Sequence, residues 1–159
     1  WNANLRGVDI NHNFNADWKT LKNKEIKAGI LGPASTRFGG YRPESEPETL
    51  ALTELCRTVN IRQAAALHSQ GEVIYWSYGE TVPPRSKKMA EIMATSSGYA
   101  LDVPTGIADG GGFKDWFITE FCRPGFTIEL GLGKNPLPAA DVEKIYERVK
   151  EMLMLFIMM

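Results

Sequence analysis

The sequence lacks an excess of charge of either sign. It carries 18 Lys and Arg against 19 Asp and Glu, so its formal net charge at pH 7 is −1. Basic residues do not gather into a stripe, and nucleic acid is therefore not an expected partner. Long apolar runs are also missing, because the longest covers only residues 152–159 and is too short to span a bilayer.

Cysteine and histidine are scarce. Cys56 and Cys122 are the only cysteines, and their wide separation favours two buried thiols over a disulfide framework. His12 and His68 are the only histidines. No secretory signal begins at Trp1, but a chain that opens on Trp rather than Met looks trimmed, so the sequence predicts no compartment.

The residues that are present predict one folded domain. Apolar residues make up 43% of 159 residues, which is enough for a hydrophobic core. Short β-branched runs alternate with helical patterns, which favours an α/β layer fold with a largely parallel sheet. Strands are expected at residues 6–10, 64–68, 73–78 and 126–130, helices at 45–60, 86–97, 114–122 and 139–159, and a long polar loop at 11–41. Such a long loop in a compact domain is usually functional.

Glu129 stands at the end of an apolar strand pattern, residues 126–130. Burying an unpaired carboxylate is costly or shifts its pKa. At the carboxyl end of a parallel strand, such an acid points into the crevice where α/β proteins bind ligands. The alternative is a glutamate at a strand end that simply faces water.

Each histidine lies at the end of a predicted strand or just beyond it. His68 ends the run 64–68 and is followed by polar residues, so it is a candidate metal ligand or acid–base group. The alternative is a core histidine bonded to a backbone carbonyl. His12 lies in Asn11-His12-Asn13, just beyond the first predicted strand, where polar side chains can meet a substrate. The alternative there is an ordinary loop histidine.

Five motifs in order resemble those of the zinc metallocarboxypeptidases. Glu129 follows Trp116 by thirteen residues, which is the spacing to the catalytic glutamate in that family. The other matching segments are Gly7-Val8-Asp9-Ile10-Asn11-His12-Asn13-Phe14, Ser45-Glu46-Pro47-Glu48-Thr49, Leu67-His68-Ser69 and Gly111-Gly112-Phe113-Lys114-Asp115-Trp116. The resemblance is strongest to the bacterial γ-D-glutamyl-L-diamino acid endopeptidases, which cut peptidoglycan stem peptides.

The resemblance implies a fold and a set of roles. The fold is three-layer α/β, with a mostly parallel mixed sheet and helices on both faces, and residues 1–159 are the C-terminal part of a single zinc peptidase domain. His68 resembles the zinc-ligating histidine, and Glu129 resembles the general base that deprotonates the zinc-bound water. Asn11 and His12 occupy substrate-contacting positions. The expected partner is a peptide, such as a cell-wall stem peptide.

Three departures from the family pattern limit these expectations. The family's other two zinc ligands come from a His-x-x-Glu motif that this sequence lacks, so the chain alone is expected to bind zinc weakly and to be inactive. His12 replaces an arginine that clamps a terminal carboxylate, which favours endopeptidase over carboxypeptidase activity. Ile107 and Asn2 stand where pancreatic-type enzymes carry a tyrosine and an arginine.

Two other functions are alternatives to hydrolysis by a zinc enzyme. A non-catalytic remnant or peptide-binding module of the same fold would explain the missing ligands. An unrelated α/β hydrolase would need a Gly-x-Ser-x-Gly elbow, and the sequence has none. Finally, the apolar tip of the helix predicted at 139–159 and an uncovered sheet edge predict self-association.

Overall fold

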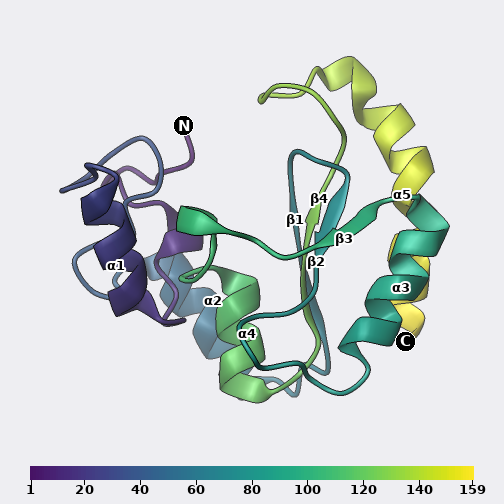
Figure 1. Cartoon of the computed structure of the whole chain (residues 1–159), viewed down its shortest axis with the longest axis horizontal. Helices are drawn as coiled ribbons and strands as arrows, with labels where there is room; N and C mark the ends of the chain where they lie inside the picture. The colour runs from purple at the N-terminus through teal and green to yellow at the C-terminus, as the bar shows by residue number, and fades with distance from the viewer.

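The computed structural model describes all residues 1–159 and contains one four-stranded mixed sheet (Figure 1). The strands are β1 (Ala64–His68), β2 (Val73–Tyr75), β3 (Ala100–Asp102) and β4 (Gly125–Glu129), in the spatial order β1-β4-β2-β3. The β1–β4 and β2–β3 pairs are parallel, and the β2–β4 pair is antiparallel. The prediction of a mostly parallel mixed sheet is therefore confirmed.

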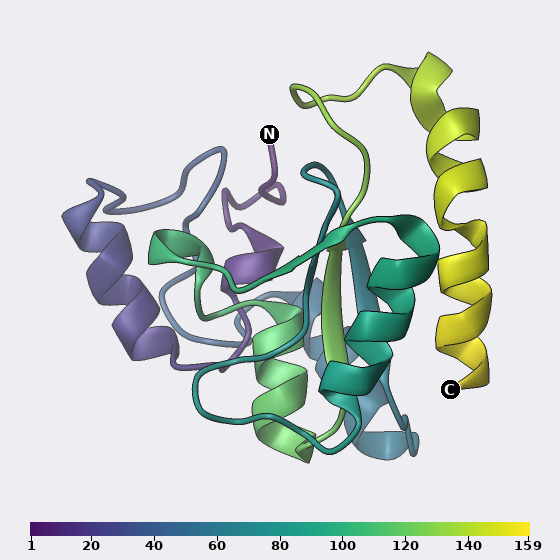
Figure 2. The same ribbon diagram turned by 45° about the vertical axis from the view of Figure 1, so that its right-hand side comes forward.

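One face of the sheet is covered by α3 (Ser86–Ser97) and α5 (Val142–Met158), which lie side by side in Figures 1 and 2. Alternate residues of a strand point to opposite faces, and Phe126 and Ile128 of β4 point to this one. They pack with Met93 and Met152, and all four side chains are fully buried. Burial of each such side chain contributes roughly 1.5–3 kcal/mol, so this cluster anchors both helices.

The opposite face is covered by α4 (Phe113–Phe121), and α2 (Pro47–Thr58) packs beside α4. Phe117 and Trp116 of α4 form the second core cluster with Cys56 of α2. Gly125 of β4 lets α4 approach closely, because a Cβ there would lie 3.1 Å from Ile118 Cγ1. Helices thus cover both faces, and the three-layer α/β prediction is confirmed.

The segment predicted as a strand at residues 6–10 is not a strand. Asp9 makes only an isolated bridge with Ala3, and the chain then forms a short 3₁₀ helix, η1 (Ile10–His12). Asn4 explains the difference, because its Oδ1 accepts the backbone N–H groups of Arg6 at 2.9 Å and Val8 at 3.1 Å. Those bonds fold the segment into a turn.

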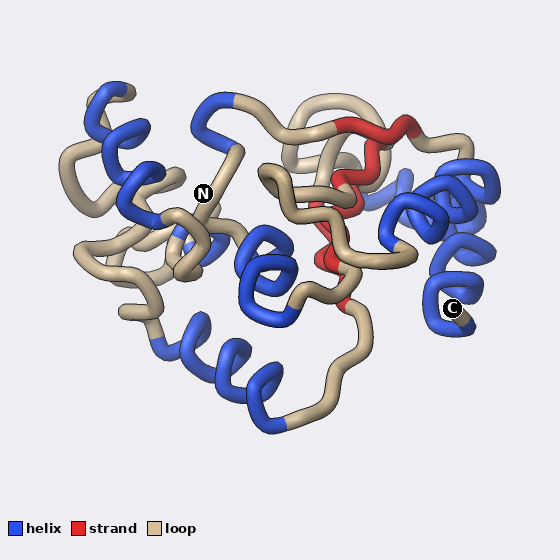
Figure 3. The backbone as a smooth tube through the Cα atoms, turned by 60° about the horizontal axis from the view of Figure 1, so that its bottom comes forward, coloured by secondary structure: helices blue, strands red, loops and turns tan.

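The predicted loop at residues 11–41 contains a helix, α1 (Trp18–Lys27), which is surrounded by loops in Figure 3. Its two buried side chains, Leu21 and Glu25, are four residues apart and share one face. Because one of them is charged, the sequence shows no apolar period there. The prediction that residues 11–41 form only a loop is therefore wrong, because α1 lies within them.

The start of α2 is held by a residue far away in the sequence, because Asn13 Oδ1 accepts the backbone N–H of Glu46 at 3.2 Å. The buried face of α2 carries Thr53 and Cys56, whereas Leu55 is 51% exposed. No helix in the structure is long and apolar enough to cross a membrane.

Candidate active site

His68 and Glu129 are partners in the register of β1 and β4. Paired residues of neighbouring strands point to the same face, and alternation from Phe126 and Ile128 places both side chains on the side of α4. Both residues end their strands and are partly buried. The structure therefore brings the predicted metal ligand and the predicted base together at one end of the sheet.

The surroundings shift the proton affinities of these groups. Burial raises the pKa of Glu129 above its ordinary value. Burial lowers the pKa of His68, and the charge of Asp9 opposes that shift. A carboxylate with a raised pKa is a better proton acceptor near neutral pH, and a neutral imidazole has a lone pair for a metal ion.

Asp9 contributes charge near His68 and was not predicted as a site residue. Its Oδ2 accepts the backbone N–H of Arg37 at 2.7 Å and the hydroxyl of Thr36 at 3.2 Å. These bonds hold a 6% exposed carboxylate in place. The only feature of the sequence that could have indicated Asp9 as a site residue is its place in the segment Gly7-Val8-Asp9.

Asn11 lies at the start of α4. Its Oδ1 accepts the backbone N–H of Phe113 at 3.0 Å, and Gly112, the N-cap residue, makes no side-chain cap bond. The C-terminus of α4 leads directly into β4, so the N-terminus of α4 lies near the carboxyl ends of β4 and of its parallel neighbour β1. Asn11 is therefore placed at the same end of the sheet as His68 and Glu129.

His12 is turned toward α1, and its Nδ1 lies 3.7 Å from Oε1 of Glu25. No pattern in the sequence indicates Glu25 as a partner, because α1 shows no apolar period. Asn13, the next residue, is fully buried and donates from Nδ2 to Gly39 O at 2.8 Å. The segment Asn11-His12-Asn13 thus combines helix capping and loop anchoring with its predicted contact to substrate.

A buried ion pair fixes the loop beside the site. Lys114 pairs with Asp115, and Lys114 Nζ also donates to Ser77 O at 2.7 Å. Asp115 Oδ2 accepts the backbone N–H of Gly110 at 3.0 Å. Burial raises the pKa of Asp115, and Lys114 opposes the shift. The pair therefore holds the turn that precedes α4.

The residues of this chain do not form a complete zinc centre. No group of three or more His, Cys, Asp and Glu side chains is arranged to hold a metal ion. A catalytic zinc ion needs three protein ligands and an open position. His68 alone does not meet this requirement.

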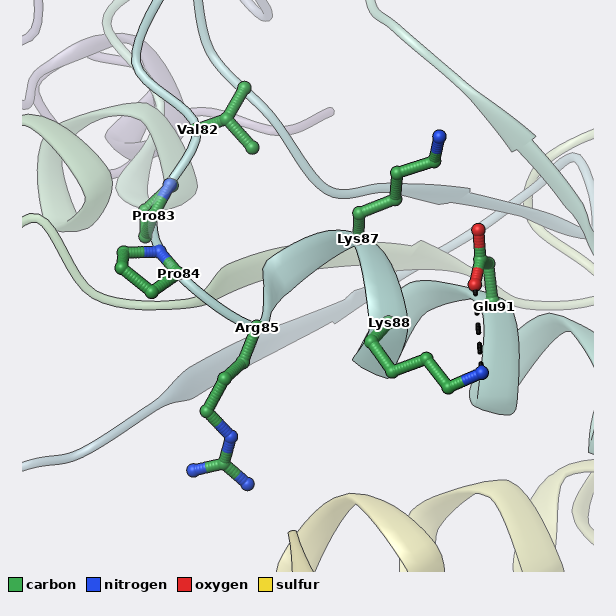
Figure 4. Close-up of a pocket in the computed structure, with 7 residues that line it drawn as sticks. All are labelled: Val82, Pro83, Pro84, Arg85, Lys87, Lys88 and Glu91. Atoms are coloured by element: carbon green, nitrogen blue, oxygen red, sulfur yellow. Dashed lines mark ion pairs between the residues drawn. The ribbon is translucent and has the colours of Figure 1, made fainter.

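The hollow drawn in Figure 4 is a separate feature. It lies where α3 begins and is lined by Val82, Pro83, Pro84, Arg85, Lys87, Lys88 and Glu91. None of the four predicted site residues contributes to it. The chemistry-bearing residues gather instead at the strand ends.

The structure is an α/β domain that holds one candidate metal ligand and one candidate base on neighbouring strands. The chain belongs to the zinc carboxypeptidase family, whose pattern matches residues 1–152. It is 40% identical over 148 residues to "Gamma-D-glutamyl-L-diamino acid endopeptidase 1" of Lysinibacillus sphaericus. That match covers 92% of this chain and 36% of the relative, so the chain spans little more than a third of that protein.

Solved structures confirm the fold. Bovine thrombin-activatable fibrinolysis inhibitor has a TM-score of 0.70 at 19% identity, and the match covers 94% of this chain and 55% of that one. A murein-tripeptide amidase from Escherichia coli O157 has a TM-score of 0.63 at 22% identity, with coverages of 97% and 60%. Both therefore support the predicted carboxypeptidase-like architecture.

Proposed function

We propose that this chain is the C-terminal part of a zinc peptidase domain that hydrolyses the γ-D-glutamyl–diamino acid amide bond of peptidoglycan-type peptides. The observation that carries the proposal is the pairing of His68 with Glu129 on one face of the sheet. The 40% identical relative named as such an endopeptidase supports the choice of bond. The partner is accordingly a cell-wall stem peptide.

Glu129 acts as the general base. It takes a proton from a water molecule, whose oxygen forms a bond to the amide carbonyl carbon. The proton then passes from Glu129 to the departing nitrogen as the carbon–nitrogen bond breaks. A pKa raised by burial suits both steps, because the group must accept and release a proton near neutral pH.

The other site residues bind and orient. His68 supplies one ligand for zinc, and the remaining ligands come from outside residues 1–159. The oxygen of Asn11 is occupied by Phe113, so its Nδ2 is the atom offered to substrate. His12 offers its Nε2. On this proposal the chain by itself binds zinc weakly and does not turn over peptide.

The test is cleavage of L-Ala-γ-D-Glu-meso-diaminopimelate by the zinc-loaded parent protein that contains these residues. We expect release of the diamino acid, and a loss of about 10²–10⁴-fold in Glu129→Gln. Glu120→Gln, at an exposed helix position, is the matched control. A Glu129→Gln variant that keeps more than about a tenth of the rate would make Glu129 a structural acid.

A second candidate is a peptide-binding module of the same fold without hydrolysis. The lack of a three-ligand metal cluster in the chain favours it. It predicts that the parent protein binds the same tripeptide but leaves it intact in the presence of zinc. The cleavage assay therefore separates the two functions.

A further inference from the structure

Glu25 is a fully buried carboxylate on α1 that the proposed mechanism does not use. Its side chain has no exposed surface. Oε1 accepts the backbone N–H of Gly39 at 3.0 Å, and Oε2 pairs with Lys22. A buried charge is retained only where partners compensate it, and Glu25 has such partners on two sides.

His12 presents an unsatisfied atom to this carboxylate. Its Nδ1 is buried and has no hydrogen-bond partner. The nearest charged acceptor is Glu25 Oε1, at 3.7 Å, which is an ion-pair distance slightly longer than a hydrogen bond. Nε2 also bonds to nothing in the protein, but it is not among the buried atoms. The ring therefore has one nitrogen facing Glu25 and one at the surface.

The surrounding backbone holds this arrangement. Gly39 is required at its position, because a Cβ there would lie 2.3 Å from His12 O and 2.9 Å from Glu25 Oε1. Trp18 Nε1 donates to Gly39 O at 2.9 Å. Lys22 Nζ lies 4.2 Å from the centroid of the Phe38 ring, so the cation that compensates Glu25 is itself packed. Glu25 and His12 consequently face each other across a rigid contact.

We propose that Glu25 is a positioning residue for His12: its carboxylate, 3.7 Å from Nδ1, favours the tautomer with the proton on Nδ1 and leaves Nε2 as the acceptor that faces substrate. The group that faces one ring nitrogen sets the role of the other. In this tautomer Nε2 of His12 accepts an amide or ammonium N–H of the substrate through a single contact. This differs from an arginine, which donates through a two-pronged fork. The assignment of a substrate contact to His12 rests on the proposed function.

The experiment measures which nitrogen of His12 carries the proton. With only two histidines in the chain, ¹⁵N-histidine labelling gives two rings to resolve, and His12→Gln identifies the His12 signals. Spectra are recorded at a pH where titration shows both rings to be neutral. We expect the His12 proton on Nδ1 in the wild-type chain. A proton on Nε2 would overturn the proposal.

Two variants test the part played by Glu25. Glu25→Gln keeps an oxygen for both Gly39 and His12, so the proton should stay on Nδ1. Glu25→Met keeps the volume but removes the acceptor, so the proton should move to Nε2. An unchanged Nδ1 signal in a folded Glu25→Met variant would show that another group orients the ring. If that variant does not fold, the wild-type and Glu25→Gln spectra still show whether the His12 proton is on Nδ1, as proposed, or on Nε2.

A control and a ligand separate this inference from the proposed function. Lys22→Met removes the cation beside Glu25 and should leave the proton on Nδ1. Addition of L-Ala-γ-D-Glu-meso-diaminopimelate should then shift the Nε2 signal of His12. If the proton is on Nδ1 but the peptide has no effect, the substrate assignment fails while the pairing of Glu25 with His12 stands.

Discussion

The side chain of Asn11 caps the helix that begins at Phe113, 102 residues further along the chain. Its Oδ1 satisfies a backbone N–H that Gly112 cannot reach with a side chain of its own. A residue expected to contact substrate therefore also fixes α4 against the strand ends. The cap uses Oδ1 and the proposed substrate contact uses Nδ2, so the two can be separated by mutation.

Asn11→Ala should lower the free energy of unfolding by about 1 kcal/mol, the usual effect of removing an N-cap acceptor. Asn11→Asp keeps an oxygen acceptor and should retain most of that stability, but it has no Nδ2 to offer a peptide. Urea unfolding of both variants, with peptide binding measured on the same samples, checks the prediction. Equal destabilisation by Ala and Asp would contradict the capping role.

Glu129→Gln should change how stability depends on pH. Burial raises the pKa of Glu129 in the folded state above 4.5, so the folded protein holds this proton more tightly than the unfolded chain does. The contribution of Glu129 is therefore greatest below about pH 4.5 and is lost as the pH rises through the folded-state pKa. Glutamine does not titrate, so the stability of the variant relative to wild type should increase over that interval.

Urea unfolding at a series of pH values between about 4 and 8 measures this difference. Glu120→Gln, at an exposed position that pairs with Arg57 at the surface, serves as the control. A difference between Glu129→Gln and wild type that stays constant with pH would show that burial does not perturb Glu129.

The elements predicted most accurately are those with uninterrupted local patterns. β1 and α3 have the predicted bounds, because apolar runs define them and Gly98, with φ of 72°, ends α3. β3 was missed, since a three-residue strand has too few residues to show a period. α1 was missed because its buried face carries Glu25.

The same distinction applies to the site. His68 and Glu129 were identifiable because each interrupts an apolar strand pattern with a chemically active group. The cap that Asn11 provides joins it to Phe113, which is remote in the sequence. The partner of His12 is Glu25, which lies in a helix that the sequence did not predict. Such contacts are set by tertiary packing and leave no local periodicity in the sequence.

The isolated chain should bind zinc weakly. His68 ends β1 without enough further side chains to complete a metal site, so affinity should be orders of magnitude below that of a three-ligand centre. Calorimetry with zinc on the wild-type chain and on His68→Ala tests this, with His12→Ala as the control. Tight one-to-one binding that His68→Ala abolishes would reveal ligands that the structure does not bring together.

The chain should also self-associate, and the structure contains two candidate surfaces. β1 is an edge strand that pairs only with β4, and its Leu67 is 52% exposed. An open apolar edge is a template for another strand, and a lysine on it opposes such pairing. α5 is docked through buried Val149 and Met152, but its tip exposes 75% of Ile157. Both surfaces were expected from the sequence, and the edge offers backbone hydrogen bonds that the tip does not.

Light scattering over a concentration series should therefore show oligomers of the wild-type chain, and Leu67→Lys should reduce them more than Ile157→Lys. Val142→Lys changes a 64% exposed residue at the other end of α5 and should have no effect. A larger effect of Ile157→Lys would show that the chains associate through the tip of α5. A wild-type chain that stays monomeric at high concentration would show that β1 is protected despite its open edge.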